Sequence, residues 1–201
     1  MNPGLVGTNF DVAALVSVVR ALAQRDAVWR AVSCHKGSKI LAQGEASHSV
    51  FVLESGLVKL IYETPGGEEW IKSFIVDCGI FASTWPVSAD RTSRFAARCL
   101  EDSQIATLPA TWVESRIAGD PELQAAVVEF NNWVLRRKQA REEALLCDTA
   151  EQRYRSFLVG EAALVKRLSQ ADIARYVGVT PVAFSRIKKR VGRGMQDGAT
   201  R

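Results

Sequence analysis

The sequence predicts an α+β protein, because segments with strand-like patterns are followed by segments with helical spacing. Three observations support this fold class. Short apolar runs separated by turn residues fill residues 39–109, an amphipathic stretch fills 120–146, and two short helical patterns joined by a glycine turn fill 168–190. A chain of 201 residues, 47% hydrophobic and 24% charged, is long enough for one ordinary domain or two small ones.

The first two zones of the chain differ in hydrophobic period. Residues 9–32 have helical spacing, which predicts one or two short helices. Closely spaced β-like runs punctuated by Gly44, Gly56 and Pro65 follow, a pattern typical of an all-β sandwich or barrel. The runs are KILAQ, SVFVLES, LVKLIYE, EWIKSFIV, RFAARCL and QIATLP. The longer gap from Gly79 to Thr92 predicts a short helix and a loop between strands.

A long helix is predicted to begin at Asp120 and Pro121, as N-cap and first helical residue, and to continue to about residue 146. Its apolar residues recur at alternating steps of four and three, which predicts a coiled-coil dimer seam. The seam residues are Leu123, Val127, Phe130 and Val134. Arg137 and Arg141 occupy the next positions of the same register, so the apolar seam is weaker at that end of the helix. The alternative is that the helix packs only on its own β domain.

The most informative motif is LSQADIARYVGVTPVAFSRIKKR, residues 168–190. Ser169 and Asp172 have the spacing of a capping box, so a helix should begin there, and Gly178 should end it. Thr180 and Pro181 repeat the start signal for a second helix. Two short helices joined by so brief a turn are typical of a helix-turn-helix.

The second helix of this motif has two different sides. At about 100° per residue, Ala183, Phe184, Ile187 and Val191 cluster on one side and predict an anchor. The other side suits DNA: Arg186 can pair with guanine, Val182 can contact a thymine methyl, and Lys and Arg can bind phosphates. The predicted DNA-binding residues are Ser169, Gln170, Thr180, Val182, Ser185, Arg186, Lys188, Lys189 and Arg190. The alternative is an ordinary helical hairpin with a solvated basic face.

Charge is distributed unevenly along the chain. The net charge is +4, but residues 148–201 hold 11 Lys and Arg against 5 Asp and Glu, whereas residues 1–147 hold 15 against 17. A basic C-terminal quarter attached to a slightly acidic body indicates a nucleic-acid-binding module.

Over nearly its whole length the chain resembles the cyclic-AMP receptor protein and FNR family of bacterial transcription regulators. The resemblance rests on FVLESGLVKLIYETPGGEEWIKSFIVDCGIF, RFAARCLEDSQIATLP, the long helix, AEQRYRSFL and LSQADIARYVGVTPVAFSRIKK. It implies a double-stranded β-helix (jelly-roll) sensor domain over residues 1–118, a dimerisation helix over 119–147 and a helix-turn-helix domain over 148–201. It also implies a homodimer on double-stranded DNA, with RNA polymerase as a further partner.

Two departures from the family pattern affect these expectations. Many members place a base-reading glutamate where this chain has Val182, so the family's usual half-site does not follow. Only 11 residues follow Arg190, which predicts a reduced wing.

The resemblance leaves the effector open. Cyclic-nucleotide-binding members have a Gly-Glu pair after an aromatic residue and an Arg-Ser pair before the next strand, for the ribose hydroxyl and the cyclic phosphate. Here Phe81 is followed by Ala82 and Ser83, and the later site reads Ser93, Arg94. The carboxylate is absent and the arginine is displaced by one position. Phe81, Ser83, Ser93 and Arg94 therefore form a weak candidate pocket for a small-molecule effector other than cyclic AMP, and the alternative is that the domain has no effector.

Other functional classes receive less support. Four cysteines at positions 34, 78, 99 and 147 match neither a metal knuckle nor a disulfide framework, and only His35 and His48 could supply imidazole. We therefore expect no catalytic residues, metal or cofactor, which argues against a cupin-like metalloenzyme. The sequence predicts no membrane partner and a cytoplasmic location. A ligand-binding adaptor that contacts protein in place of DNA stays open as the alternative function.

Overall fold

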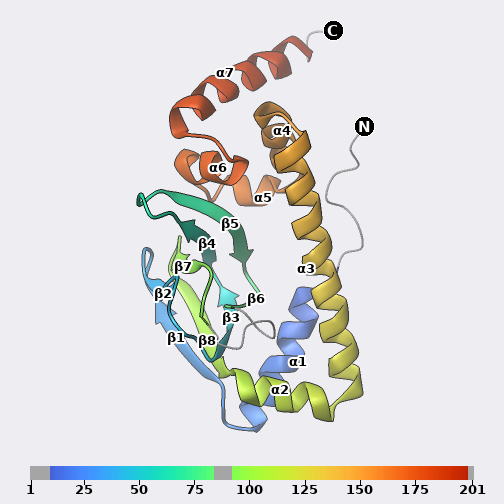
Figure 1. The fold of residues 1–201 in the computed structure, drawn as a ribbon. Helices are drawn as coiled ribbons and strands as arrows, with labels where there is room; N and C mark the ends of the chain where they lie inside the picture. The colour runs from blue at the N-terminus through green and yellow to red at the C-terminus, as the bar shows by residue number, and fades with distance from the viewer. Residues whose placement is uncertain (1–9, 84–91, 199–201) are drawn as a thin grey trace. The chain divides into compact units, whose positions relative to one another are not determined.

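The computed structural model describes residues 10–83 and 92–198. The chain forms two compact units, of which the first is Phe10–Trp133 and the second begins at Val134. The boundary falls inside the long helix α3 (Pro121–Cys147) (Figure 1). In the part of the chain that is described, every helix is too short or too polar to span a lipid bilayer.

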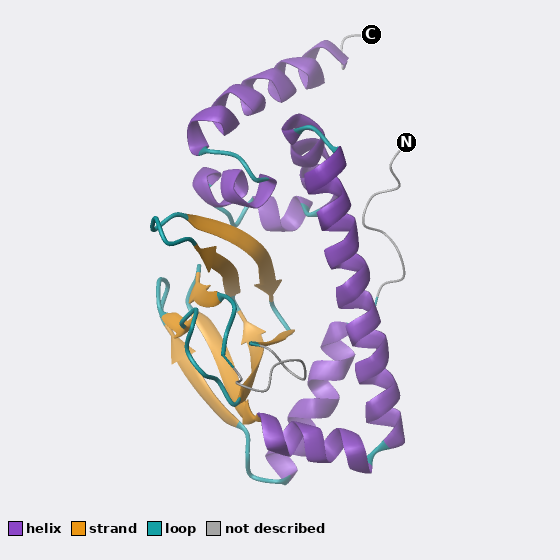
Figure 2. Cartoon of the chain, in the orientation of Figure 1, coloured by secondary structure: helices purple, strands orange, loops and turns teal. Residues whose placement is uncertain are grey.

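The described strands of the first unit form two antiparallel sheets (Figure 2). Sheet A has the strand order β1-β8-β3-β6 and sheet B has the order β2-β7-β4-β5. The strands are β1 (Arg30–Cys34), β2 (Lys39–Leu41), β3 (Ser49–Ser55), β4 (Leu57–Glu63), β5 (Glu69–Val76), β6 (Gly79–Ala82), β7 (Ala96–Cys99) and β8 (Ser103–Pro109). Consecutive strands therefore often lie in different sheets, so the chain crosses repeatedly from one sheet to the other.

The two sheets share one apolar core. Leu53 and Ile105 of sheet A pack in the same cluster as Val58 and Leu60 of sheet B. The opposite face of sheet A is covered by α1 (Val12–Arg25), whose Val16 packs with Val52 and Leu108. Because both faces of β3 are buried, its sequence VFVL is continuously apolar where a half-exposed strand would alternate.

Helices follow the β domain. α2 (Ala110–Gly119) leads into α3, whose start is capped by Asp120: its Oδ1 accepts hydrogen bonds from the backbone N–H groups of Glu122 (3.0 Å) and Leu123 (3.1 Å). The described part of the second unit contains the end of α3, α4 (Ala150–Gly160), α5 (Ala162–Val165), α6 (Gln170–Val177) and α7 (Pro181–Gly198). Residues 134–198, all described, contain no strand that could belong to a wing.

Most predicted elements are confirmed. The runs SVFVLES, LVKLIYE and EWIKSFIV coincide with β3, β4 and β5, and α3 begins at Pro121 as predicted. Two predictions were wrong. Residues 30–32, predicted to be helical, begin β1, and Gly79–Ala82, predicted to be helix or loop, form β6 beside β3. Both strands are short and are defined by the strands with which they pair. The rest of the predicted helix and loop, residues 84–91, lies outside the described residues.

Gly56 connects β3 to β4 with a backbone that other residues rarely adopt. Its φ is +109°, and a Cβ there would lie 2.2 Å from Ser103 Oγ and 2.8 Å from Ser103 Cα. Gly44 also has positive φ, +83°, but a Cβ there would meet nothing within 4 Å.

We expect Gly44→Ala to lower the free energy of unfolding by about 1–2 kcal/mol, the backbone cost alone. Gly56→Ala should cost roughly 3 kcal/mol or more, because β8 must also move away from the new methyl group. Urea unfolding monitored by tryptophan fluorescence measures both losses. Equal losses for the two variants would show that the contact with Ser103 is unimportant.

Candidate nucleic-acid interface

Local capping interactions define α6 and α7. Ser169 Oγ accepts a hydrogen bond from the backbone N–H of Asp172 (3.0 Å), so α6 begins where the capping box predicts. Gly178 ends α6 in the left-handed conformation, with φ +82° and its N–H bonded to the carbonyl of Ala174 (3.0 Å). Thr180 Oγ1 then accepts from the N–H of Ala183 (3.3 Å) at the start of α7. The connection between the two helices is three residues long, from Gly178 to Thr180.

The described side chains of α7 divide into a buried and an exposed side. Phe184, Ile187 and Val191 are only 2%, 5% and 2% exposed, and the ring of Phe184 packs edge-on against Tyr154 of α4 with centroids 4.8 Å apart. Val182 is 69% exposed. The predicted contact residues of α7 are all exposed, namely Val182, Ser185, Arg186, Lys188, Lys189 and Arg190. The division of the helix by angle is therefore confirmed.

The other predicted contact residues lie at the starts of the two helices. Ser169, Gln170 and Thr180 are exposed, although the hydroxyls of Ser169 and Thr180 already serve as caps. Arg190 also has a partner within the unit, since its Nε lies 3.4 Å from a carboxylate oxygen of Glu151. The carboxylate of Glu151 offsets part of the positive charge that Arg190 would present to a phosphate.

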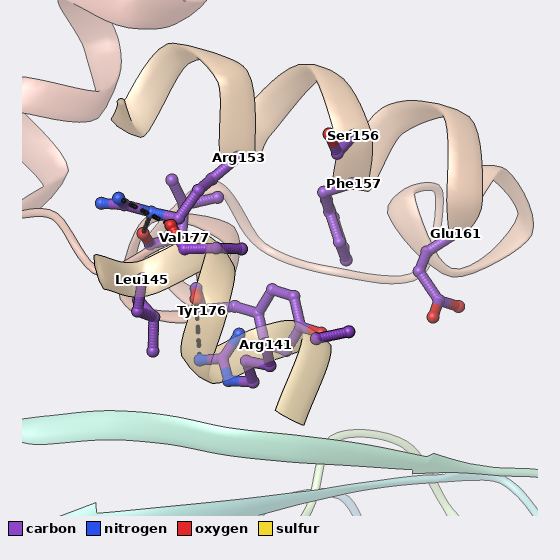
Figure 3. Close-up of a pocket in the computed structure, with 10 residues that line it drawn as sticks. Arg141, Leu145, Arg153, Ser156, Phe157, Glu161, Tyr176 and Val177 are labelled. Carbon is purple, nitrogen blue, oxygen red and sulfur yellow. Dashed lines mark hydrogen bonds between the residues drawn. The ribbon is translucent and has the colours of Figure 1, made fainter. Parts of the chain in front are cut away.

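Arg153 of α4 joins the ends of two helices (Figure 3). Its Nε donates to the carbonyl of Val177 at the end of α6 (2.7 Å), and its Nη1 donates to the carbonyls of Asp148 (2.6 Å) and Ala144 (3.5 Å) at the end of α3. The last carbonyls of a helix have no partner within that helix, and a cation placed there also interacts favourably with the helix dipole. One guanidinium therefore caps both helices.

Two arginines of α3 reinforce this junction. Arg141 Nη2 donates to the carbonyl of Tyr176 (2.9 Å), and its guanidinium lies 4.0 Å from the centre of the Tyr176 ring. Arg137 Nη2 pairs with a carboxylate oxygen of Glu161 (3.0 Å). The side chains around the junction, including Leu145 and Phe157, line a small cavity of about 60 Å³ (Figure 3). Sequence reasoning treated Arg137 and Arg141 only as interruptions of an apolar seam and missed Arg153.

The predicted seam residues on α3 are largely engaged within their own chain. Leu123 is 6% exposed, and the ring of Phe130 lies 5.7 Å from that of Phe10 and 5.9 Å from that of Trp133. Val127 and Val134 are half-buried. The exposed apolar residues on this helix are others, and among them Val128 and Leu135 are each 53% exposed.

The four predicted effector residues occupy different environments. Phe81 is buried in the core and stacks on Phe51 with centroids 5.1 Å apart. Ser93 is 1% exposed and its hydroxyl donates to the carbonyl of Phe95 (2.6 Å). Ser83 is buried, whereas Arg94 is exposed. The structure thus assigns Phe81 and Ser93 to the internal packing of the β domain.

Metal-binding groups are dispersed in the described part of the chain. Among residues 10–83 and 92–198, no three His, Cys, Asp or Glu side chains come together where they could hold an ion. Of the two histidines, His35 has its Nδ1 3.8 Å from Asp102 Oδ1, with both side chains exposed.

Comparison with known proteins adds independent findings. Residues 31–119 match the model of the cyclic nucleotide-binding domain. The chain is 26% identical over 172 residues to a protein named transcriptional activator protein anr from Pseudomonas aeruginosa, covering 77% of this chain and 67% of that protein. It is 24% identical over 182 residues to transcriptional activator protein FnrA from Stutzerimonas stutzeri, covering 82% and 71%.

Solved structures show the same fold. FixK2 from Bradyrhizobium japonicum matches with a TM-score of 0.73 and 20% identity, covering 83% of this chain and 86% of that one. A mutant of CooA from Carboxydothermus hydrogenoformans matches with a TM-score of 0.72 and 16% identity, covering 94% and 86%.

The chain is thus a protein with a β domain of the cyclic nucleotide-binding type followed by a helical unit. The resemblance to the cyclic-AMP receptor protein and FNR family that the sequence motifs indicated is borne out by the domain over residues 31–119 and by the similarity to these transcriptional activators. The expectation that the chain is not an enzyme agrees with these relatives, which are named as transcription regulators.

The Arg153 junction can be tested by a matched pair of substitutions on α4. We expect Arg153→Met to lower the free energy of unfolding by about 2–3 kcal/mol, because partly buried carbonyls lose a charged donor. Arg155→Met, two residues away, removes only an exposed ion pair with Glu151 and should cost no more than about 0.5 kcal/mol. Urea unfolding followed by circular dichroism measures both, and similar costs for the two variants would contradict the role of Arg153.

Proposed function

We propose that the chain is a homodimeric transcription regulator that binds a palindromic DNA site by inserting α7 into the major groove. The observation that carries this proposal is the division of α7, whose apolar side is buried against α4 while Val182, Arg186 and the lysines face outward. An exposed valine beside an arginine on a basic helix suits a groove that presents thymine methyls and guanine acceptors. The names of the relatives, which are transcriptional activators, support the same class of function.

The exposed residues divide into two roles. Val182, Ser185 and Arg186 lie in the first two turns of α7, the part of a recognition helix that contacts base edges. Lys188, Lys189 and Arg190 follow and suit phosphates, as do Ser169, Gln170 and Thr180 at the helix starts. The net positive charge of residues 148–201 supplies the long-range attraction to DNA.

We propose that α3 joins two copies of the chain. Val128 and Leu135 are seven residues apart and therefore share one helix face, the repeat that a coiled coil requires. Leu123 and Phe130 support the helix within its own chain, while Val127 and Val134 border this face. The resulting domain organisation is a sensor over 1–118, a connector over 119–147 and a DNA-binding domain over 148–201, in a cytoplasmic protein that works with RNA polymerase.

The input to the β domain is proposed to be something other than cyclic AMP. Ala82 and Ser83 replace the Gly-Glu pair that would bind a ribose hydroxyl, so the acceptor carboxylate is missing from this position. Phe81 and Ser93 are committed to internal contacts, which leaves Arg94 as the exposed charge of the predicted set.

The base-reading role of Arg186 is testable once a site has been selected from a random DNA pool. We expect Arg186→Ala to reduce the preference for that site over random DNA roughly tenfold to a hundredfold, the value of one bidentate contact with guanine. Lys188→Ala is the matched control, and it should weaken binding to both DNAs equally and lower the salt slope by about one. Gel-shift titrations at two salt concentrations measure these effects. Unchanged preference in Arg186→Ala would reject the assignment.

The dimer proposal is tested by placing a charge on the exposed face of α3. Leu135→Glu should weaken self-association at least about tenfold, since two like charges would replace an apolar contact in the seam. Val159→Glu introduces the same charge at a residue of α4 that is 85% exposed, and the dimer should persist. Sedimentation equilibrium distinguishes the two variants. A monomeric Val159→Glu, or a fully dimeric Leu135→Glu, would place the interface elsewhere.

A further inference from the structure

Two cysteines lie at the same end of the β domain, in different sheets. Cys34 is the last residue of β1 in sheet A, paired with Ser103, and Cys99 is the last residue of β7 in sheet B. The turn after β1 is tied to Cys99 by backbone hydrogen bonds: Gly37 N–H donates to the Cys99 carbonyl and Cys99 N–H donates to the Ser38 carbonyl, both at 2.9 Å. The backbone therefore brings residues 34 and 99, distant in sequence, into one small region.

Both side chains point toward the interior between the sheets. Cys99 belongs to the shared apolar core and Cys34 packs against that core. Both cysteines therefore contribute to the same apolar cluster. Cys99 is 1% exposed, and burial is the main reason why its pKa is raised, with the neighbouring Cys34 and Asp102 acting in the same direction and Ser103 in the opposite one. Cys34 is half-buried, so solvent reaches it more easily.

We propose that Cys34 and Cys99 form a peroxide-reactive dithiol that closes to a disulfide between sheets A and B. The Cys34 thiolate attacks a hydroperoxide oxygen, so an S–O bond forms, the O–O bond breaks, and the leaving oxygen is protonated to water or an alcohol. Cys99 sulfur then attacks Cys34 sulfur: the S–S bond forms, the S–O bond breaks, and the hydroxide leaves as water with the proton of Cys99. Two thiols lose two electrons in total, and the peroxide accepts them.

The other two cysteines serve as internal references. Cys147 at the end of α3 is exposed and so reports how fast an ordinary accessible thiol reacts. Cys78 lies after β5, and its Sγ contacts the carbonyl of Glu54 at 3.8 Å. Cys147 and Cys78 are not part of the core cluster that contains Cys99 and against which Cys34 packs.

Mass spectrometry of the full-length protein tests the proposal. The reduced protein is treated with increasing hydrogen peroxide and then unfolded in denaturant, the remaining thiols are alkylated, and peptides are mapped. The expected result is that Cys34 and Cys99 become protected together, before Cys147, in a linked peptide two hydrogen atoms lighter than the sum of its parts. Reduction with dithiothreitol should restore both thiols.

Two variants identify the order of steps. Cys99→Ser should stop at a Cys34 sulfenic acid that a dimedone probe labels, whereas Cys34→Ser should leave Cys99 reduced at the same dose. Circular dichroism establishes that each variant is folded. The peptide map of the oxidised wild-type protein tests the disulfide even if a variant does not fold. The proposal is overturned if Cys147 is oxidised while Cys34 and Cys99 remain alkylatable, or if wild-type Cys34 accumulates as dimedone adduct without a link to Cys99.

Discussion

The placement of α7 depends on one guanidinium that satisfies the carbonyl ends of two helices. Arg153 donates to Val177 at the end of α6 and to Asp148 at the end of α3. Because α7 follows α6 after only three residues, fixing the end of α6 fixes where α7 begins. A buried carbonyl without a partner costs about 1–3 kcal/mol, so any movement of α6 away from α3 must break these bonds and replace them. The junction can therefore act as a stiff link between α3 and the start of α7.

The two sides of α7 then separate stability from recognition. Phe184, Ile187 and Val191 are held by core packing, which leaves the outward side chains free to vary without unfolding the unit. Arg186 projects from this fixed surface, and a bidentate contact requires such a fixed base. Arg190 differs because Glu151 lies beside its guanidinium and offsets part of its charge.

The sequence predicted interactions between near neighbours well and those between distant residues poorly. The caps at Ser169, Thr180 and Asp120 involve partners two or three residues away, and their motifs can be read directly. Arg153 and Val177 are 24 residues apart, and no periodicity signals such a contact. The strand β6 was missed for the same reason, because four residues become a strand only when β3 lies beside them. The apolar seam on α3 was visible, but which apolar residues the chain itself would cover depended on the aromatic contact of Phe130 with Phe10.

Packing of the β domain also limits what can be inserted among its core residues. Phe81 stacks on Phe51 within the core shared by the two sheets, and Ser93 is bonded inside the same domain. A ligand of nucleotide size placed among these residues would have to displace close-packed rings, which is costly in a dense interior. Oxidation of the two thiols that share this core requires no such space, because it removes two hydrogen atoms and adds a bond across the sheets. A chemical signal of that kind therefore suits the observed packing better than the insertion of a large molecule does.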